Sequence, residues 1–428
     1  SSRAAPRRCP PPRVALRFPV KKWAALAAIP VAGFYLLLSG SGIPATRAFL
    51  MAALVMLAVA MDRNPVSLRM LAVAGVAILL MTPEALLSAS FQMSFSAVAG
   101  LIAAYEAYAR YRIRHLAARG DGAPGKARFG RIPRYFLAIV VTTLIAEVVL
   151  APSVLYHFNR HALYGILGNL VAMPLMAMWI MPAGVLGMVL MPFGLDGVPF
   201  RIMGEGVDLM VATARFVSAL PGAELPVPAF SGLSYGIIML AFITVILLRG
   251  RARLVAVPML VAGLVLAVAT PRPGLLVDGR GQVMAVAGPD GRFWFPPGRA
   301  GQHARRVAME RSGVWRQSRW AWGPDGGAVD EGIDWLRCDG QGCIYRPPGV
   351  RGVTVALVRD PVAALEDCRM ADLVVALERL DASCQRTATV IDWAAIREWG
   401  GHAVHFGPAG IGTIETVADH RGQRPWSR

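Results

Sequence analysis

The chain has 428 residues, of which 55% are hydrophobic and 17% are charged, and its mean hydropathy is +0.49. Soluble proteins carry about 25% charged residues, so this composition excludes a single soluble globular protein, as well as a disordered or collagen-like chain. The net charge of +17 favours a membrane protein with basic loops, or a protein that handles nucleic acid, or both.

The basic excess lies in one part of the chain. Residues 1–270 carry 24 basic and 9 acidic side chains, whereas residues 271–428 carry 20 and 18. We therefore expect a cytoplasmic linker over 1–22, a transmembrane domain over 23–270 and a soluble domain over 271–428. The opening segment has no apolar run behind a short basic head, so we expect no signal peptide. Because the sequence begins with Ser1, we expect it to be a piece of a longer protein.

Apolar segments of membrane-spanning length recur between Trp23 and Thr270. Buried core helices are the alternative for any one segment, but a succession of eight favours a membrane domain, with about seven to nine helices. The segments are 23–39, 47–61, 69–87, 91–107, 135–156, 162–191, 233–248 and 254–270.

The Lys and Arg side chains predict orientation, because cytoplasmic loops carry an excess of them. They gather in the first 22 residues, at Arg63 and Arg69, in the loop from Arg110 to Arg134, and at 249–253. All four places lie inside only if 162–191 returns to the side that it entered, as two short helices or a re-entrant hairpin broken at Pro174 and Pro182. We then expect 192–232 outside, with 200–220 as an interfacial helix, and the C-terminal domain outside. A single crossing would place that domain in the cytoplasm.

The C-terminal segment predicts a small soluble α/β domain with a layered sheet. Asp392 is the expected N-cap of a helix over 393–399. The predicted strands are Leu275–Asp278, Gln282–Ala287, Arg292–Phe295, Val353–Val358, Ala371–Leu377, Thr387–Ile391 and Ala403–Phe406.

Four cysteines lie in this domain, namely Cys338, Cys343, Cys368 and Cys384. An even number in an exported domain allows two disulfides with three connectivities, and the segment between Cys338 and Cys343 suits a turn closed by a disulfide. Four buried thiols are the alternative. The spacing is not that of a zinc site, and we expect no metal and no cofactor.

Three stretches of the transmembrane part resemble a known family. They are Gly33–Gly40 followed by Pro44–Phe49, then Phe91–Val98 after Pro83 and Glu84, and Phe158–Arg160 running into Gly168–Leu170 and Met173–Leu175. In order and spacing they are similar to the membrane domain of the ComEC family of DNA-internalisation competence proteins, over about residues 20–270. The resemblance implies an inner-membrane channel that passes one strand of DNA into the cytoplasm during natural transformation.

The chain departs from that family in two ways. Typical members carry an oligonucleotide-binding-type domain near their start, which is missing here. Many members end in a metallo-β-lactamase-like domain, whose chemistry needs an HxHxDH run to hold metal, and none of the seven His lies in such a run. The C-terminal segment instead resembles the short, metal-free region of some Gram-negative members, which implies a decayed version of that fold. No Walker motif occurs, and we expect no covalent catalysis.

Polar side chains within apolar segments are costly and mark pathways. We expect Glu147 either to line a DNA pathway or to be a carboxyl paired with a neighbouring helix. We expect Gln92, which shares a helix face with Ser96, to line the DNA pathway as well. Hydrogen bonding between helices is the alternative for these side chains. Arg47 either lines the pore or reaches the membrane surface.

The outer end of segment 135–156 is rich in cationic, amide and aromatic side chains. Phosphate contacts dominate the affinity of proteins for nucleic acid, and aromatic rings stack on unpaired bases, so we expect a strand to enter here. An interfacial belt of aromatic and basic residues is the alternative. The expected pathway residues here are Tyr156, His157, Asn159, Arg160, His161 and Asn169, with Phe158 and Tyr164 as further rings.

The sequence therefore predicts a polytopic α-helical membrane protein of the bacterial inner membrane with a C-terminal soluble α/β domain. The expected partners are single-stranded DNA, the lipid bilayer, and the DNA-delivery and motor or strand-binding proteins of the competence machinery, with an oligomer as a possible assembly. A membrane-anchored metallo-β-lactamase-like hydrolase or nuclease, and a small-solute transporter, are the alternative functions.

Overall fold

The computed structural model describes residues 19–62, 67–119, 131–314, 318–320, 334–360, 362, 364–381, 383–408 and 410–422. Most of the predicted linker, Arg63 and residues 120–130 of the basic loop lie outside the described residues. The chain divides into two compact units. The first contains Ser1–Val154, Leu163–Ala223 and Phe242–Leu254, and the second contains Leu155–Ala162, Glu224–Ala241 and Val255–Arg428.

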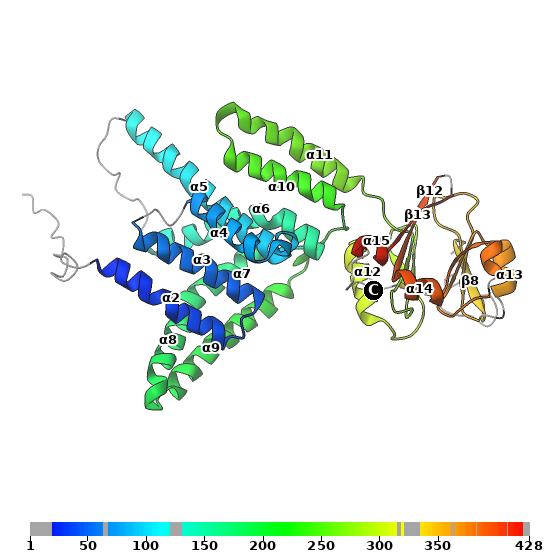
Figure 1. Cartoon of the computed structure of the whole chain (residues 1–428), viewed down its shortest axis with the longest axis horizontal. Coiled ribbons are helices and arrows are strands. Elements are labelled where there is room, and N and C mark those ends of the chain that lie inside the picture. Colours follow the sequence, from blue (N-terminus) through cyan, green and yellow to red (C-terminus); the bar gives the residue numbers. More distant parts are fainter. Residues whose placement is uncertain are drawn as a thin grey trace, which may run out of the picture. The chain divides into compact units, whose positions relative to one another are not determined.

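The part of the chain before residue 270 is helical, with every predicted apolar segment in a helix (Figure 1). Its helices are α2 (Val20–Leu38), α3 (Ile43–Ala60), α4 (Leu68–Met81), α5 (Ala89–Arg119), α6 (Arg131–Phe158), α7 (Gly165–Leu175), α8 (Met181–Leu190), α9 (Gly197–Ser218), α10 (Gly232–Leu247) and α11 (Ala256–Val268). Shorter turns are η1 (Pro83–Leu87), η2 (Met176–Ile180), η3 (Met191–Phe193) and η4 (Gly250–Val255).

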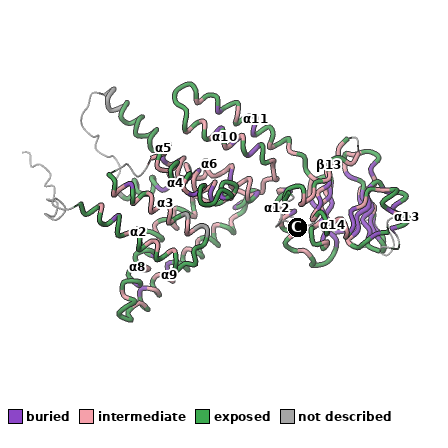
Figure 2. Tube along the Cα trace, viewed as in Figure 1, coloured by how far each residue is buried: buried purple, intermediate pink, exposed green. Residues whose placement is uncertain are grey.

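Four helical stretches among the described residues are long and apolar enough to cross a membrane, namely Val20–Leu38, Ile132–Phe158, Gly165–Phe193 and Gly250–Val268. These helices turn large apolar side chains outward, as Val148 (74% exposed) and Val268 (89% exposed) illustrate. Figure 2 shows the contrast with the C-terminal strands, where buried residues gather. Apolar surface that no other part of the chain covers is what lipid tails require, so the chain is a membrane protein.

The predicted break at Pro174 and Pro182 is wrong. Gly165–Phe193 forms one continuous apolar helix of 29 residues, in which η2 is a single π-helical turn. A π turn accommodates the hydrogen bond that Pro174 cannot donate, and Pro182 stands in the first turn of α8, where no donor is needed. The segment is therefore neither two separate helices nor a re-entrant hairpin.

The predicted interfacial helix over 200–220 corresponds to α9, which is the second arm of a helical hairpin, and its place at a membrane surface stays a prediction. Helix α9 packs along α7, η2 and α8, and α8 and α9 lie side by side in Figure 1. Glycines allow this close approach, because a methyl group at Gly187 would overlap the ring of Phe200. Trp179 Nε1 donates a hydrogen bond of 2.8 Å to the carbonyl of Ile202. Helix α9 runs back along α7 and α8. The reversal of the chain that we expected from a break within 162–191 therefore comes from α9 instead.

The C-terminal domain contains two sheets rather than one. The six-stranded sheet has the order β13-β12-β3-β4-β5-β6 and the five-stranded sheet the order β11-β10-β9-β8-β7. The strands of the first are β3 (Leu275–Val277), β4 (Met284–Ala287), β5 (Phe293–Phe295), β6 (Ser318–Arg319), β12 (His402–Gly407) and β13 (Gly410–Thr416), and those of the second are β7 (Leu336–Cys338), β8 (Gly342–Tyr345), β9 (Val355–Val358), β10 (Leu373–Ala376) and β11 (Thr389–Ile391). The domain's helices are α12 (Gln302–Ser312), α13 (Ala364–Met370), α14 (Trp393–Trp399) and α15 (Val417–Arg421).

The two sheets share one core. Side chains from both, such as Val286 on β4 and Val375 on β10, are fully buried in the same cluster. The opposite face of the five-stranded sheet packs against α13 through Cys368, and that of the six-stranded sheet packs against α12 through Ala308. The domain is therefore built of four layers, helix, sheet, sheet and helix, which explains why so many of its strands are apolar on both faces.

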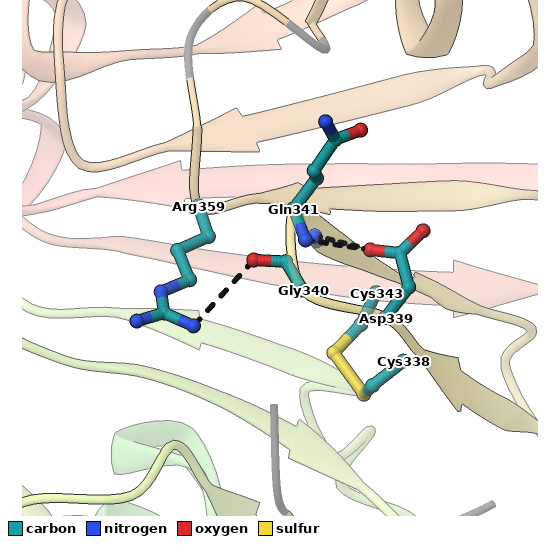
Figure 3. The surroundings of a disulfide bond; sticks show 7 residues. Cys338, Asp339, Gly340, Gln341, Cys343 and Arg359 are labelled. Carbon is teal, nitrogen blue, oxygen red and sulfur yellow. Dashed lines mark hydrogen bonds between the residues drawn. A yellow bond between two sulfur atoms is a disulfide. The ribbon is translucent and has the colours of Figure 1, made fainter. Parts of the chain in front are cut away.

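The four cysteines form two disulfides, Cys338–Cys343 and Cys368–Cys384. Cys338 and Cys343 face each other across the paired strands β7 and β8, which the sequence did not predict. Figure 3 shows the turn between them, where a carboxylate oxygen of Asp339 accepts hydrogen bonds from the backbone of residues 341 and 342, at 2.8 and 2.7 Å. This turn is short and polar, so the cysteine spacing was the feature of the sequence that indicated it.

Tyr345 on β8 ties the two sheets together. Its hydroxyl donates to the carbonyl of Ala287 at 2.9 Å and lies 3.2 Å from that of Gly274, next to the six-stranded sheet. Burial raises the pKa of the phenol well above its usual range. The buried Tyr345 side chain is therefore neutral near physiological pH, because ionising it would place a charge in the interior of the domain.

We expect Tyr345→Phe to lower the free energy of unfolding of this domain by about 1–2 kcal/mol near neutral pH, because the buried carbonyls lose their shared donor. A raised folded-state pKa means that the neutral phenol stabilises the fold below about pH 10 and that this stabilisation is lost as the pH rises further. Urea unfolding of the detergent-solubilised chain, followed by tryptophan fluorescence at neutral and alkaline pH, measures both effects. The alkaline loss should be smaller in Tyr345→Phe than in the wild type, and equal losses would contradict the assignment. The exposed Tyr108→Phe is the control.

Candidate nucleic-acid interface

Helix α6 ends in a sharp corner at Asn159. The residue has φ +54°, a left-handed conformation that asparagine tolerates better than most residues. Its N–H donates to the carbonyl of Leu155 at 3.1 Å, and its own carbonyl accepts from the N–H of Val227 at 2.9 Å. The helix is thereby capped and the chain is directed into the next strand.

The corner continues as a short two-stranded ribbon. Strand β1 (Arg160–Ala162) pairs antiparallel with β2 (Glu224–Pro226). Beyond β2, the N–H of Ala229 donates to the carbonyl of Arg311 at the end of α12, at 2.9 Å. Residues 155–162 and 224–235 therefore form one connected substructure, which we call the α6 corner.

An aromatic cluster fills the α6 corner. The rings of Tyr156 and Tyr235 stack with centroids 4.3 Å apart and an angle of 3° between their planes. Phe230 and His157 surround this pair, with ring centroids 5.7 Å from Tyr156 and 5.9 Å from Tyr235, respectively. The hydroxyl of Tyr156 lies so close to Gly232 that any side chain there would crowd it. The cluster thus joins the end of α6 to the first turn of α10.

The cation of the α6 corner is paired. Arg160 Nη1 lies 3.7 Å from a carboxylate oxygen of Glu224, and the two residues are diagonal neighbours in the ribbon. Both side chains are nearly half exposed, at 42% and 46%. An ion pair at such exposure contributes little stability, so a phosphate can take the place of the carboxylate at small cost. The pairing with Glu224 therefore makes the α6 corner less cationic than the sequence indicates.

Besides its backbone N–H, Asn159 has a side-chain amide donor, Nδ2, that is unpaired among the described residues. Its side chain is 92% buried, since only 8% of it is exposed, and within the described chain its Nδ2 has no hydrogen-bond partner. A buried amide donor left unpaired costs about 1–3 kcal/mol, which a bound acceptor would recover. Buried polar groups in proteins are nearly always hydrogen-bonded, so this unpaired amide is an unusual feature of the α6 corner.

Glu147 lies in the middle of α6, nine residues before Tyr156 in the sequence. Its carboxylate packs directly against Gly165, the first residue of α7. The positive end of a helix favours an anion there, so this geometry matches the expectation of a carboxyl paired with a neighbouring helix.

The other predicted pathway residues lie on different elements. Gln92 Nε2 donates to the carbonyl of Leu86 at 3.0 Å and so closes the turn between η1 and α5. Asn169 is exposed on α7, and Tyr164 donates its hydroxyl to the carbonyl of Pro221 at 3.0 Å. Arg47 is in α3, but its side chain lies outside the described residues.

The structure therefore brings together Tyr156, His157, Asn159, Arg160 and His161, the last of which lies opposite Leu225 in the ribbon. It adds Glu224, Phe230 and Tyr235, which the sequence reasoning missed. The aromatic pair Phe230 and Tyr235 at the start of an apolar segment was the available signal, since it mirrors the aromatics at the end of segment 135–156. Across the part of the chain that the structure describes, no three His, Cys, Asp or Glu side chains are grouped to hold a metal ion.

These features define a membrane protein with a four-layer α/β domain and an aromatic and polar corner at the end of an apolar helix. The family described as "Competence protein" matches residues 5–252, more than half of the chain, and the chain belongs to this family. Membership assigns it a role in DNA uptake during competence, with DNA and the competence machinery as its partners. No curated protein and no solved structure matches the chain.

The contact between Glu147 and Gly165 is open to a direct test. We expect Gly165→Ala to destabilise the helical part by less than about 1 kcal/mol, because its methyl group would displace the carboxylate at the flexible end of Glu147 and so remove its favourable position at the start of α7. Gly168→Ala is the matched control, because Gly168 on the same helix faces open space and alanine favours a helix by about 1 kcal/mol. Thermal melts in detergent, followed by circular dichroism, measure both. With Glu147 already replaced by alanine, Gly165→Ala should cost less than it does in the wild type, and an equal loss in both would show that the carboxylate is not responsible.

Proposed function

We propose that the protein forms the inner-membrane channel through which single-stranded DNA enters the cytoplasm during natural transformation, and that the α6 corner contacts the strand. The observation that carries the proposal is the aromatic and polar cluster at the end of the apolar span Ile132–Phe158. Nothing in a purely structural helix end requires an exchangeable arginine, a buried unpaired amide and stacked tyrosines together.

In this proposal, capture begins with exchange of partners at Arg160. A backbone phosphate replaces the Glu224 carboxylate, and the guanidinium binds two phosphate oxygens in the way that its planar shape favours. Tyr156, which is partly exposed and stacked on the buried Tyr235, would offer its ring to a base, which every base can use whatever its identity. The contacts are sequence-independent, as uptake of arbitrary DNA requires.

Glu147 has a different role here from the one first considered. A carboxylate repels phosphates, whereas its packing against Gly165 orients the start of α7. We infer that Glu147 is a positioning residue rather than a contact of the DNA.

The chain, in this proposal, performs no covalent chemistry and does not supply the energy for movement. Its sequence has neither an HxHxDH run nor a Walker motif. A motor or a strand-binding protein of the competence machinery would pull the strand, and the bilayer would hold the channel.

We further propose that the C-terminal domain is a decayed metallo-β-lactamase-like fold on the periplasmic side. Its four layers support the fold. The two disulfides support the compartment, because disulfides persist in the periplasm and are rare in the cytosol.

The DNA contact is tested by transformation of a competent strain that lacks this gene and is complemented with variants of the full-length gene. We expect Tyr156→Leu to lower uptake of labelled DNA by about tenfold, since one base stack contributes about 1–3 kcal/mol. We expect Tyr235→Leu to lower it too, because it removes the buried ring that holds Tyr156 in place. Tyr108→Leu, a change of an exposed tyrosine on α5, is the matched control and should transform normally. Normal uptake in both corner variants, at equal protein levels, would contradict the proposal.

The compartment is tested with reporter fusions. Alkaline phosphatase joined after the last residue should be active, because that enzyme needs periplasmic disulfide formation, and a green fluorescent protein at the same place should be dark. The same reporters after Arg119, in the basic loop, should give the opposite pattern. An inactive phosphatase and a bright fluorophore at the C-terminus would place the domain in the cytoplasm.

A further inference from the structure

A polar hollow of about 440 Å³ lies on the C-terminal domain, away from the shared core of the two sheets. It opens between the end of α13, the turn η5 (Cys384–Arg386) and the starts of β10 and β11. Nearly all of its surface is polar, and its side chains include Arg369, Arg386, Gln385 and Thr389. No function assigned so far uses these residues.

A disulfide builds the hollow. Cys368 on α13 is joined to Cys384 on η5, with the two Cα atoms 5.2 Å apart. Arg369 follows the first cysteine directly, and Arg386 stands two positions after the second. The covalent bond therefore holds two arginines, from separate elements, beside one opening. Both cysteines are buried against the outer face of the five-stranded sheet. The backbone beside each cysteine is therefore held in place, while Arg369 and Arg386 are exposed.

The hollow has an excess of positive charge, with two arginines against one acidic residue among those that line it. Asp372 is the one acidic residue among those that line it, and a carboxylate oxygen of Asp372 accepts from the N–H of Thr354 at 2.8 Å. Among the described residues, the side chains of Arg369 and Arg386 make no ion pair and no hydrogen bond. By contrast, Arg292 and Arg337 in the same domain have carboxylate partners. This arrangement leaves two guanidinium groups available at one place, where a phosphate with its several oxygen acceptors fits them both.

We propose that this hollow binds a phosphate group of a single-stranded DNA backbone. The inference rests on the proposed function for the identity of the strand, although the phosphate site itself does not depend on the channel. Arg369 and Arg386 would each bind phosphate oxygens, and Gln385 and Thr389 would supply weaker neutral donors. A nearly neutral domain thereby acquires a local contact for the DNA, which a net charge of the whole domain would not reveal.

The test is fluorescence anisotropy of a labelled oligothymidylate titrated with the full chain in nanodiscs of neutral lipid. We expect Arg369→Gln with Arg386→Gln to weaken binding about tenfold at moderate salt, and to make the slope of affinity against salt shallower by about one to one and a half, because two phosphate contacts are lost. Arg280→Gln with Arg351→Gln is the matched control, since both arginines are exposed in the same domain and have no ion pair with a described residue, and it should bind as the wild type does. Unchanged affinity and salt slope in the Arg369 and Arg386 variant would overturn the proposal.

Two further arms separate the explanations. Cys368→Ala with Cys384→Ala keeps both arginines but removes the bond that holds them, and should weaken binding by a similar factor. Vesicles of anionic phosphatidylglycerol replace the oligonucleotide in the second arm. If the arginine variant loses vesicle binding and keeps oligonucleotide binding, the hollow serves a lipid headgroup and the proposal is wrong.

The same titration with Tyr156→Leu distinguishes the hollow from the α6 corner. Weaker binding in Tyr156→Leu together with wild-type binding in the arginine variant would reject the hollow and leave the channel proposal standing. The reverse result would support the hollow and count against the corner.

Discussion

The left-handed turn at Asn159 is the constraint on which the α6 corner depends. It stops the helix at one residue and sends the chain into the ribbon of β1 and β2. The ribbon in turn sets Arg160 diagonally opposite Glu224, and it returns the chain so that α10 begins beside the end of α6, where Tyr235 covers Tyr156. A residue that could not adopt positive φ would extend the helix or shift the strand register, and the stacking and the ion pair would both be lost.

The two kinds of structure in this chain follow from where apolar surface can be hidden. The helical part satisfies its backbone hydrogen bonds within each helix, so it can leave apolar side chains outward for lipid, and glycines at Gly187 and Gly263 let neighbouring helices approach closely. The C-terminal domain instead hides its apolar side chains between two sheets and under two helices. The Cys368–Cys384 disulfide, which spans 16 residues, and the hydroxyl of Tyr345 then join separate elements of that domain.

The accuracy of the sequence predictions depended on how local each feature is. The helix over 393–399 was predicted with its cap, and the structure has α14 over the same residues, with Ala395 donating to Asp392 at 3.0 Å, because an N-cap and its helix are neighbours in the chain. The break at Pro174 and Pro182 was predicted wrongly, because proline removes one hydrogen bond but a π turn and the packing of α9 allow the helix to continue. Strands β7 and β8 were missed, since each is only a few residues long and is stabilised by its neighbours.

The sequence by itself determined that the chain is a membrane protein with an apolar basic part and a nearly neutral α/β part, and it placed the chain in its family. Composition and hydropathy report the first two properties because they sum over many residues and do not depend on which segments meet, whereas the family follows from the resemblance of three motifs in their order. Only the tertiary structure decided which residues share a site: that Tyr156 stacks on Tyr235, that Glu224 holds Arg160, that Glu147 packs against Gly165, and that the segments joined by one disulfide place Arg369 and Arg386 on the same hollow. Such contacts join positions up to 79 residues apart in the chain, and their partners are chosen by how helices and strands pack, which no local pattern encodes.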